Sequence, residues 1–427
     1  MSSRASSEPD LGATPWDVVV VGAGVAGAMV AGELARLRRP ARVLLVERAA
    51  WPRTKVCGCC LNAAAVGVLS RAGLGTLLEA GATRIEKLRV RVLGRHFDCA
   101  HRGLAIARDR LDHALVERAV AAGVEFADAC SAVLVPPSSC DRDARTRRLT
   151  LRTRGGERVI ESFCIIAADG LDGGLLRGHR EFESLVDDTS WMGLGATIPS
   201  SAGPERTPDD PRRGPELGTI EMNVARRGYA GLVRLAGGEV NLAAAVDPHE
   251  VRSAGSPEAA VARILSESGS TVRAESLRFR GTPLLTRRRA TLAMNRVFVL
   301  GDSAGYVEPF TGEGMAWALA GAEELGRLLA VTALTEAEEL DQAGARWHQW
   351  HQRTVRRRQT ICHAVRAAAR APRAVAAAIG VPGVAGLIAG GARLLSAQTG
   401  RAYAGSRSAL EPRGIHARLA VSPGEAT

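Results

Sequence analysis

Lysine is almost missing from this chain of 427 residues: Lys55 and Lys87 are the only lysines among 56 basic residues. Aromatic residues are also scarce, at 4% of the composition. Arginines therefore carry the net charge of +11, and they are spread along the chain without interleaved aromatic residues. No zinc-finger or RNA-binding pattern accompanies them, so we expect no nucleic-acid partner. The arginine excess reflects either a GC-rich coding bias or attraction to an anionic cofactor or membrane surface.

A disulfide framework is also lacking, because the eight cysteines stand at irregular spacings. No signal peptide precedes the first predicted strand, and the polar residues 1–14 are predicted to be disordered. We therefore expect reduced thiols in a cytoplasmic protein.

Long apolar runs are absent as well. The segment 374–392 is rich in alanine and glycine and is interrupted by Pro382, whereas a membrane span needs about 20 strongly apolar residues. We favour packing of this segment against the body of the protein. The alternative is an interfacial amphipathic helix, since arginines near Trp347 and Trp350 suit a membrane surface. Peripheral membrane contact through the C-terminal region therefore stays open.

A dinucleotide-binding fingerprint stands near the N-terminus. An apolar strand at 16–21 leads directly into Gly22-x-Gly24-x-x-Gly27, a helix follows, and a second strand ends at Glu47. Gly22 permits a tight turn, Gly24 lets the backbone approach a pyrophosphate, and Gly27 lets the helix pack on the strand. The helix N-terminus attracts phosphate, and Glu47 is placed to bind ribose hydroxyls. The complete unit predicts a dinucleotide site.

Two later strands also end in an acidic residue. The apolar run 163–168 is followed by Asp169 and Gly170, and the run 297–300 is followed by Gly301 and Asp302. Ligands in α/β proteins bind at the carboxyl ends of parallel strands. The second stretch continues into a turn that must approach a flat, bulky group before a helix begins; its key residues are Pro309, Gly312, Glu313 and Gly314.

The loop 51–61 holds one of the two lysines and three of the eight cysteines. A metal site is not expected here, because C-x₂-C spacing and a second Cys/His pair are missing. A redox-active or covalently linked cysteine, with Cys57 the main candidate, is one interpretation. The favoured one is a loop packed beside the cofactor, with Arg53 or Lys55 serving phosphate, substrate or cofactor charge. Arg108, just before a predicted helix, is either a surface residue or a phosphate ligand.

The pattern changes between residues 184 and 280, where short alternating runs replace long helical periods. We predict an α/β fold with a Rossmann-type domain (15–75, 100–183 and 281–330) and an inserted antiparallel β-sheet domain that binds substrate (76–99 and 184–280). Residues 331–427 form a predicted helical extension. Trp191, Met222 and Tyr229 are equally plausible as core and as substrate contacts.

Three motifs in this order resemble the FAD-dependent hydroxylase superfamily (class A flavoprotein monooxygenases), which includes para-hydroxybenzoate hydroxylase and geranylgeranyl reductase. They are the glycine fingerprint with Glu47, Ala168-Asp169-Gly170, and Gly301-Asp302. Pro52-Arg53-Thr54-Lys55-Val56-Cys57-Gly58 and the stretch 301–314 are most similar to the geranylgeranyl-reductase branch, which usually has glycine where this chain has Cys59. The resemblance implies a fold of the glutathione-reductase-like, para-hydroxybenzoate-hydroxylase type.

The resemblance also implies FAD as cofactor. The first fingerprint would bind the ADP half, Asp302 the ribitol, and Arg108 the flavin side of the diphosphate. Asp169 and Gly170 would lie near the pyrophosphate. The backbone at Pro309 and residues 312–314 would line the isoalloxazine ring, which makes Lys55, Cys57 and Pro309 the catalytic candidates.

The favoured function is an NAD(P)H-driven monooxygenase that uses O₂ to hydroxylate a hydrophobic aromatic or polyketide-like small molecule. The alternative is a reductase or dehydrogenase acting on C=C bonds of a prenyl or other lipid chain. A non-catalytic FAD-binding protein is a minor third hypothesis. Halogenation is not expected, because the W-x-W-x-I-P segment of flavin-dependent halogenases is missing.

Overall fold

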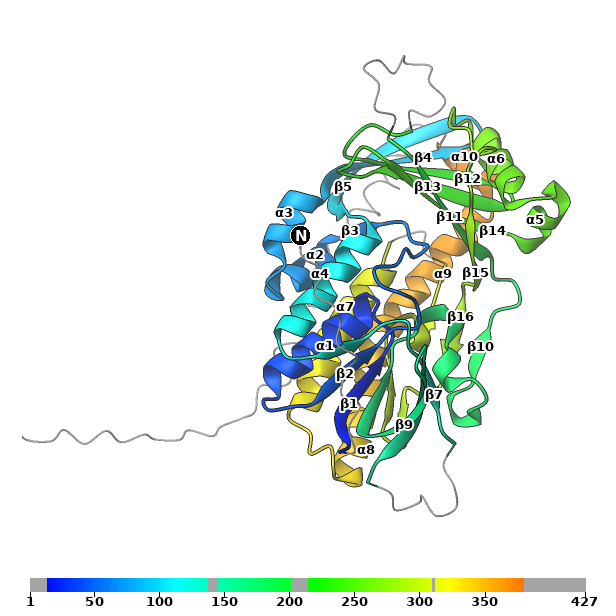
Figure 1. Ribbon diagram of the computed structural model, residues 1–427. Helices are drawn as coiled ribbons and strands as arrows, with labels where there is room; N and C mark the ends of the chain where they lie inside the picture. The colour runs from blue at the N-terminus through cyan, green and yellow to red at the C-terminus, as the bar shows by residue number, and fades with distance from the viewer. Residues whose placement is uncertain (1–13, 137–144, 201–213, 309–311, 380–427) are drawn as a thin grey trace, which may run out of the picture.

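The computed structural model describes residues 14–136, 145–200, 214–308 and 312–379. The predicted N-terminal tail (1–13), Pro309 and most of the apolar segment 374–392 lie outside the described residues. Two large sheets with their covering helices, a small third sheet and a set of C-terminal helices make up the described part of the chain (Figure 1).

The first sheet is the predicted Rossmann-type core. Its five parallel strands run in the order β18-β9-β1-β2-β6, and β17 closes one edge in the antiparallel sense. The antiparallel strands β7 and β8 extend it through β9. The strand bounds are Trp16–Val21 (β1), Val43–Val46 (β2), Glu125–Ala127 (β6), Ser131–Leu134 (β7), Arg147–Thr153 (β8), Gly156–Ala167 (β9), Ala293–Met294 (β17) and Val297–Val299 (β18).

Helix α1 (Val25–Leu37) lies between α4 (Arg108–Ala121) and α7 (Gly314–Ala330) on this sheet. Its residues from Val25 to Ala35 are all buried, because neighbours cover it on every side. The strands beneath it are continuous valine and leucine runs, which is typical of parallel strands with both faces covered. The shorter helices α2 (Ala63–Arg71) and α3 (Gly75–Gly81) come after β2 in the chain.

The second sheet has the order β15-β11-β14-β13-β12-β4-β5-β3. It is antiparallel as predicted, except that β12 and β4 pair in parallel. The strand bounds are Cys60–Asn62 (β3), Thr83–Val92 (β4), Arg95–Ala105 (β5), Met192–Ile198 (β11), Thr219–Ala225 (β12), Gly228–Arg234 (β13), Val240–Val246 (β14) and Arg280–Leu284 (β15).

Two details of this insert differ from the expectation. Helices α5 (Pro248–Ala254) and α6 (Pro257–Ser268) interrupt a segment in which no helical period was expected. Both begin with a capping side chain followed by proline, a start signal that the alternating pattern around them obscured. In addition, the predicted domain bounds need correction: β5 runs through the boundary between residues 99 and 100, and β3 and most of β15 lie in ranges predicted for the Rossmann-type domain.

A three-stranded sheet, in the order β10-β16-β19, brings segments from both parts of the chain together. Its strands are Ser184–Val186 (β10), Arg287–Arg289 (β16) and Gly305–Tyr306 (β19). Because β19 begins three positions after Asp302, this sheet fixes the glycine-rich stretch against β16.

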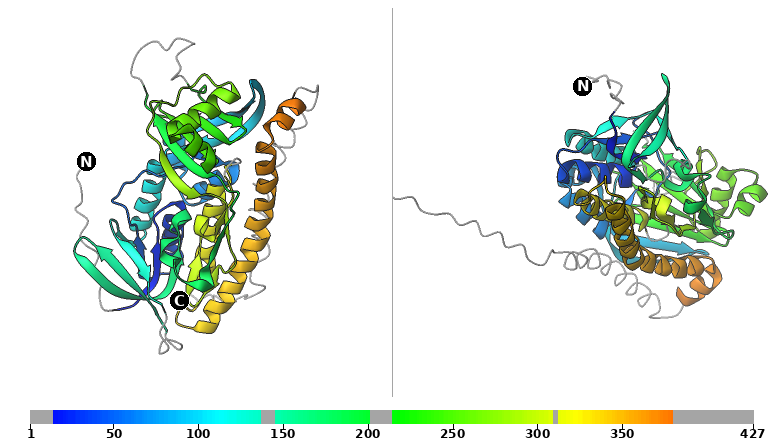
Figure 2. Two further views of the ribbon diagram at one scale, coloured as in Figure 1. Left: turned by 90° about the vertical axis from the view of Figure 1, so that its right-hand side faces the viewer. Right: turned by 90° about the horizontal axis from the view of Figure 1, so that it is seen from below.

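The C-terminal helices α8 (Ala337–His351) and α9 (Arg357–Ala369) are joined by a π-helical turn at Gln352–Arg356, and α10 (Pro372–Ile379) follows. Together they run along one side of the molecule from the first sheet to the second (Figure 2). Trp347 anchors α8, since its indole N–H donates to the Val299 carbonyl at 3.2 Å. Among the described residues, no helix is both long and apolar enough to cross a bilayer.

Candidate FAD and substrate site

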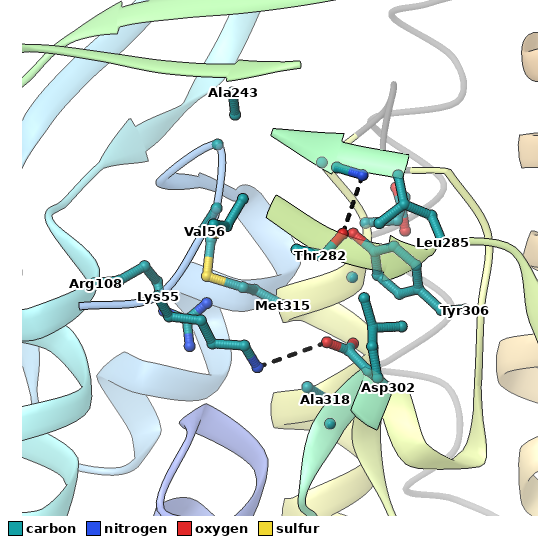
Figure 3. Close-up of a pocket in the computed structure, with 18 of the residues that line it drawn as sticks. Lys55, Val56, Arg108, Ala243, Thr282, Leu285, Asp302, Tyr306, Met315 and Ala318 are labelled. Atoms are coloured by element: carbon teal, nitrogen blue, oxygen red, sulfur yellow. Dashed lines mark hydrogen bonds and ion pairs between the residues drawn. The ribbon is translucent and has the colours of Figure 1, made fainter. Parts of the chain in front are cut away.

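One large cavity, of about 1870 Å³, lies where the two sheets and α9 meet (Figure 3). Pockets for single small ligands usually measure about 300–1,000 Å³. This cavity therefore has room for a dinucleotide and a second ligand. Its polar end contains the glycine fingerprint and the residues around Asp302, and its apolar end lies against the second sheet.

The three glycines of the fingerprint are required for different reasons. A Cβ on Gly22 would lie 2.5 Å from the Ala168 carbonyl oxygen, and one on Gly27 would lie 1.8 Å from the Gly22 oxygen. The fold itself therefore excludes a side chain at both positions. A Cβ on Gly24 would meet nothing nearer than Arg53 Nη2, at 3.6 Å. The space over Gly24 is thus open toward the cavity, as a bound diphosphate requires.

Three cations surround this open space. The same Cβ position on Gly24 lies 4.0 Å from both Arg108 Nη2 and Lys55 Nζ. Arg53 and Arg108 share the fully buried Asp112: Arg108 binds it through Nε at 3.1 Å and Nη2 at 3.0 Å, and Arg53 Nη1 lies 3.1 Å from it. One carboxylate thus orients two guanidinium groups and leaves positive charge beside the start of α1.

Glu47 is placed at the end of β2 as predicted, and it is buried. Its carboxylate accepts backbone N–H groups of Ala23 and Ala49, both at 3.1 Å, and pairs with Arg53 Nε at 3.1 Å. In this form Glu47 holds the glycine turn in place. Its contact with an adenosine ribose stays a prediction.

The Asp169 carboxylate accepts hydrogen bonds from other residues of the protein. Its carboxylate accepts the Leu175 N–H at 2.8 Å and the Ser303 hydroxyl at 3.0 Å, and burial raises its pKa. The Gly170 N–H in turn donates to Ser303 Oγ at 2.8 Å. Asp169 and Gly170 are therefore locked to the strand end that carries Asp302, which joins two of the predicted motifs in one site.

Asp302 faces the cavity, and Lys55 Nζ lies 3.8 Å from its carboxylate (Figure 3). Gly301, at φ +68°, makes the turn that presents it, and a Cβ there would lie 2.9 Å from the Ala26 side chain. The two predicted site residues Lys55 and Asp302 thus meet across the cavity, although they are separated by 247 positions in the printed numbering.

Gly312, Glu313 and Gly314 lead into α7 and line the same cavity. Glu313 is held from two sides, since the Asn62 amide donates to it at 3.3 Å and Arg358 pairs with it at 3.2 Å. A Cβ on Gly314 would lie 2.9 Å from the Tyr306 ring. The predicted ring-facing turn therefore has Tyr306 against it.

Cys57 lines the cavity on the loop opposite this turn. Hydrogen bonding from Cys59, followed by the charge of Arg108, lowers the pKa of the half-buried Cys57 to about 5. Cys59 has a φ of +59°, a left-handed conformation that costs a residue with a Cβ about 1–2 kcal/mol. This is the position at which the resembling branch usually has glycine.

The far end of the cavity is apolar and lies between the second sheet and α9. Met222 and Tyr229 are among its lining residues, whereas Trp191 packs behind Tyr229 with ring centroids 5.9 Å apart. The main apolar lining residues are Leu88, Val90, Phe97, Ile220, Met222, Val224, Val233, Leu285, Ile361, Val365 and Ala369.

Asp112, Ser303, Tyr306 and helix α9 were not identified as parts of the site from the sequence. The i, i+4 spacing of Arg108 and Asp112 on a predicted helix is a signal that could have found one of them. The other contacts join segments far apart in the chain, and no local pattern shows them. Across the described ranges there is no group of three or more ligating side chains that could hold a metal ion.

Comparison with known families decides the cofactor. A family described as an FAD binding domain matches residues 15–358 of this chain. The chain belongs to this family. The predicted superfamily, the fold class and the assignment as an FAD-dependent oxidoreductase are thereby confirmed.

Two curated relatives are named menaquinone reductase. The protein from Mycobacterium tuberculosis is 30% identical over 331 residues, which cover 74% of this chain and 75% of the relative. The protein from Mycolicibacterium smegmatis is 30% identical over 336 residues, with coverage of 74% and 76%.

Solved structures share the fold at lower identity. PqsL from Pseudomonas aeruginosa, described as a probable FAD-dependent monooxygenase, has a TM-score of 0.65 at 22% identity, and the match covers 84% of this chain and 98% of PqsL. The flavin-dependent brominase Bmp2 has a TM-score of 0.70 at 16% identity, with coverage of 93% and 98%. At these identities the likeness concerns the fold alone.

The residues of this chain fit FAD. The open space over Gly24, the cations Arg53, Lys55 and Arg108, and the start of α1 form a cradle for the diphosphate. Asp302 and residues 312–314 line the same cavity, and their contacts with the ribitol and the ring stay predictions. Pro309 lies outside the described residues, so its predicted place at the ring stays a prediction.

Proposed function

We propose that this protein is an FAD-dependent reductase that transfers hydride to a carbon–carbon double bond of a prenyl or comparable lipid chain, such as the chain of a lipid quinone. The observation that carries the proposal is the apolar end of the cavity, which is continuous with the FAD cradle and lined by aliphatic side chains. The two relatives named menaquinone reductase support a lipid quinone as the substrate class.

Bound FAD supplies hydride transfer from its reduced ring, and the protein supplies orientation and a proton. Addition of hydride to one carbon requires a proton at the other. Tyr306 lines the cavity against the ring-facing turn, and burial holds its pKa well above 10.0, so its hydroxyl stays protonated. We propose Tyr306 as the proton donor to the reduced bond.

Reduced nicotinamide is the electron donor in this proposal. Arg353 and Arg357 are exposed and line the cavity from the π-helical turn and the start of α9. Their charge would attract a phosphate-bearing donor to the opening. With Ile361, 39% exposed and also in the lining, they form an entrance that is both cationic and apolar. Such an entrance also suits a lipid substrate arriving from an anionic membrane surface.

The test is turnover with and without oxygen. FAD-loaded protein is mixed with NADH or NADPH and menaquinone in detergent micelles, and the product is identified by mass spectrometry. We expect a product that gains two hydrogen atoms in the absence of O₂. A product formed only with O₂ and carrying label from ¹⁸O₂ would instead establish the monooxygenase alternative, which an enclosed apolar compartment also suits. No product under either condition contradicts this substrate class.

Tyr306→Phe tests the proton donor. FAD occupancy should be unchanged, while turnover falls by about 10²-fold or more, the usual contribution of a general acid. Tyr229→Phe is the matched control, because it removes a second hydroxyl of the same cavity, from a ring that packs on Trp191. Equal losses in both variants would assign the effect to packing and remove Tyr306 from the role.

A further inference from the structure

Cys57, Cys59 and Cys60 stand within four residues of one another, on the loop that faces the FAD cradle. A cysteine that only fills space in a hydrophobic core has no reason to be close in sequence to another cysteine. The other cysteines of the described residues are buried and stand far apart in the sequence. Cys164, for example, lies in strand β9, and burial raises the pKa of its thiol to about 12. The grouped cysteines therefore need a separate explanation.

Cys57 has the surroundings of a reactive thiolate. The Cys59 N–H donates to Cys57 Sγ at 3.4 Å, and the positive charge of Arg108 acts on the same sulfur. The residue is only half-buried and lines a cavity large enough to admit small oxidants. Low-pKa, accessible cysteines of this kind are the ones that peroxides oxidise.

Cys59 provides a second thiol within reach. Its thiol donates to the Cys57 carbonyl oxygen at 3.8 Å, while its backbone N–H donates to the Cys57 sulfur. Two residues of chain span at most about 7 Å, which overlaps the Cα separation of about 4.4–6.8 Å found in disulfides. Cys59 also keeps a left-handed backbone that glycine would adopt without strain. A cysteine in a backbone conformation that costs it free energy suggests that its thiol has a function.

We propose that Cys57 and Cys59 form a peroxide-sensitive dithiol pair in the wall of the cofactor cavity. The Cys57 thiolate attacks the O–O bond of hydrogen peroxide, which gives a sulfenic acid and hydroxide. The Cys59 thiol then attacks that sulfur, and a disulfide forms as water leaves. The pair loses two electrons to one peroxide, and a dithiol reductant restores both thiols by exchange.

This site goes beyond the proposed reductase activity and does not depend on it. Reduced flavoproteins can release hydrogen peroxide when O₂ reaches the ring, so FAD bound in this cavity would supply the oxidant close to the pair. Oxidation removes the negative charge beside Arg108 and adds a covalent cross-link to the loop that carries Lys55. The protein would therefore change its FAD site in response to its own side product.

Mass spectrometry of one peptide tests the proposal. FAD-loaded, full-length protein is treated with hydrogen peroxide, the free thiols are alkylated, and the protein is digested with trypsin. Cleavage after Lys55 and Arg71 releases a peptide, 56–71, that contains all three cysteines. We expect this peptide to lose two hydrogen atoms and to carry one alkyl group, on Cys60. Treatment with a dithiol should restore three alkyl groups.

Two variants sharpen the assignment. Cys60→Ser should still form the disulfide, whereas Cys59→Gly should stop at the sulfenic or sulfinic acid of Cys57. The glycine suits the backbone at this position, so that variant should fold and keep FAD. A Cys57–Cys60 disulfide, oxidation no faster at Cys57 than at the buried Cys164, or three thiols still alkylated after peroxide would each overturn the proposal.

Discussion

At the scale of single residues, the glycine fingerprint separates what the protein needs from what its cofactor needs. Gly22 and Gly27 leave no room for a Cβ because backbone atoms of the protein lie where it would be. Gly24 has room within the protein, and a side chain there would project into the space over the start of α1. The backbone at Gly24 is extended, with φ −76°, which alanine also adopts.

Substitution by alanine should therefore give opposite phenotypes at these positions. Gly24→Ala should fold normally and lose FAD, because the added methyl group occupies the diphosphate position. Gly27→Ala should be destabilised by several kcal/mol or fail to fold, because its Cβ would lie 1.8 Å from the Gly22 oxygen. Urea unfolding and flavin absorbance of the purified variants measure the two effects. A Gly24→Ala protein that purifies fully yellow would contradict the cradle.

The pH dependence of thiol reactivity follows from the surroundings of Cys57. Its pKa of about 5 lies below the ordinary 9.0, so the reactive thiolate is present above about pH 5 and is lost as the pH falls through this value. The iodoacetamide rate of FAD-free protein should therefore be flat in neutral solution and fall near pH 5. Arg108→Met removes the nearby charge and should move the fall toward higher pH. An unchanged profile in that variant would exclude Arg108 as a cause.

At the scale of elements, α9 is the wall that turns an open sheet face into a cavity. It is held by Glu308, whose side chain is fully buried and accepts Arg370 at 2.7 Å and Arg366 at 3.3 Å. Arg366 also pairs with Asp187 at 2.6 Å and thereby holds its pKa well below the usual range. Among the ion pairs of the described residues that hold the wall, the buried carboxylate of Glu308 is the one shared by two arginines.

Glu308→Gln should loosen this wall. The substitution keeps the shape of the side chain but leaves two poorly solvated guanidinium groups without their shared charge, which we expect to cost about 3 kcal/mol of unfolding free energy. Glu157→Gln is the matched control, since Glu157 and its partner Arg152 are more than half exposed, at 59% and 56%; its loss should stay below about 1 kcal/mol. Equal effects in urea unfolding would contradict a structural role for Glu308.

At the scale of the whole molecule, the cavity is built by two sheets, whose strands alternate in groups along the chain, and by helix α9. The first sheet provides the cradle, the second sheet provides the apolar wall, and α9 closes the space between them (Figures 1 and 2). A ligand that fills the cavity binds only when these parts are together. FAD should therefore stabilise the molecule as one unit.

Unfolding in the presence of FAD tests this. At a free concentration one hundred times Kd, FAD should add about 2.7 kcal/mol to the free energy of unfolding. Far-ultraviolet circular dichroism and tryptophan fluorescence should shift by the same amount, since both sheets contact the ligand cavity. In the Gly24→Ala variant, FAD should add nothing to the free energy of unfolding. A shift in only one of the two signals would show that the units unfold independently.

The sequence could point to the residues at the polar end of the cavity, because their patterns are local. A strand, a glycine turn and a helix are adjacent in the chain, so Gly22, Gly24 and Gly27 could be assigned with their reasons. Asp169, Gly301 and Asp302 could be found because each follows an apolar strand. The inserted sheet could also be recognised from short runs in which apolar and polar residues alternate, although helices α5 and α6 in the same segment were missed.

Only the tertiary structure decided how these pieces meet. Lys55 and Asp302 face each other, Ser303 locks Asp169 to the neighbouring strand end, and Asp112 orients two arginines. The apolar end of the cavity is formed by strands and by α9, which are far apart in sequence. Local patterns show which face of an element is apolar, but burial against a particular partner depends on the path of the whole chain. For this reason the sequence by itself determined that the protein has a dinucleotide site, and the fold decided what lies beside it.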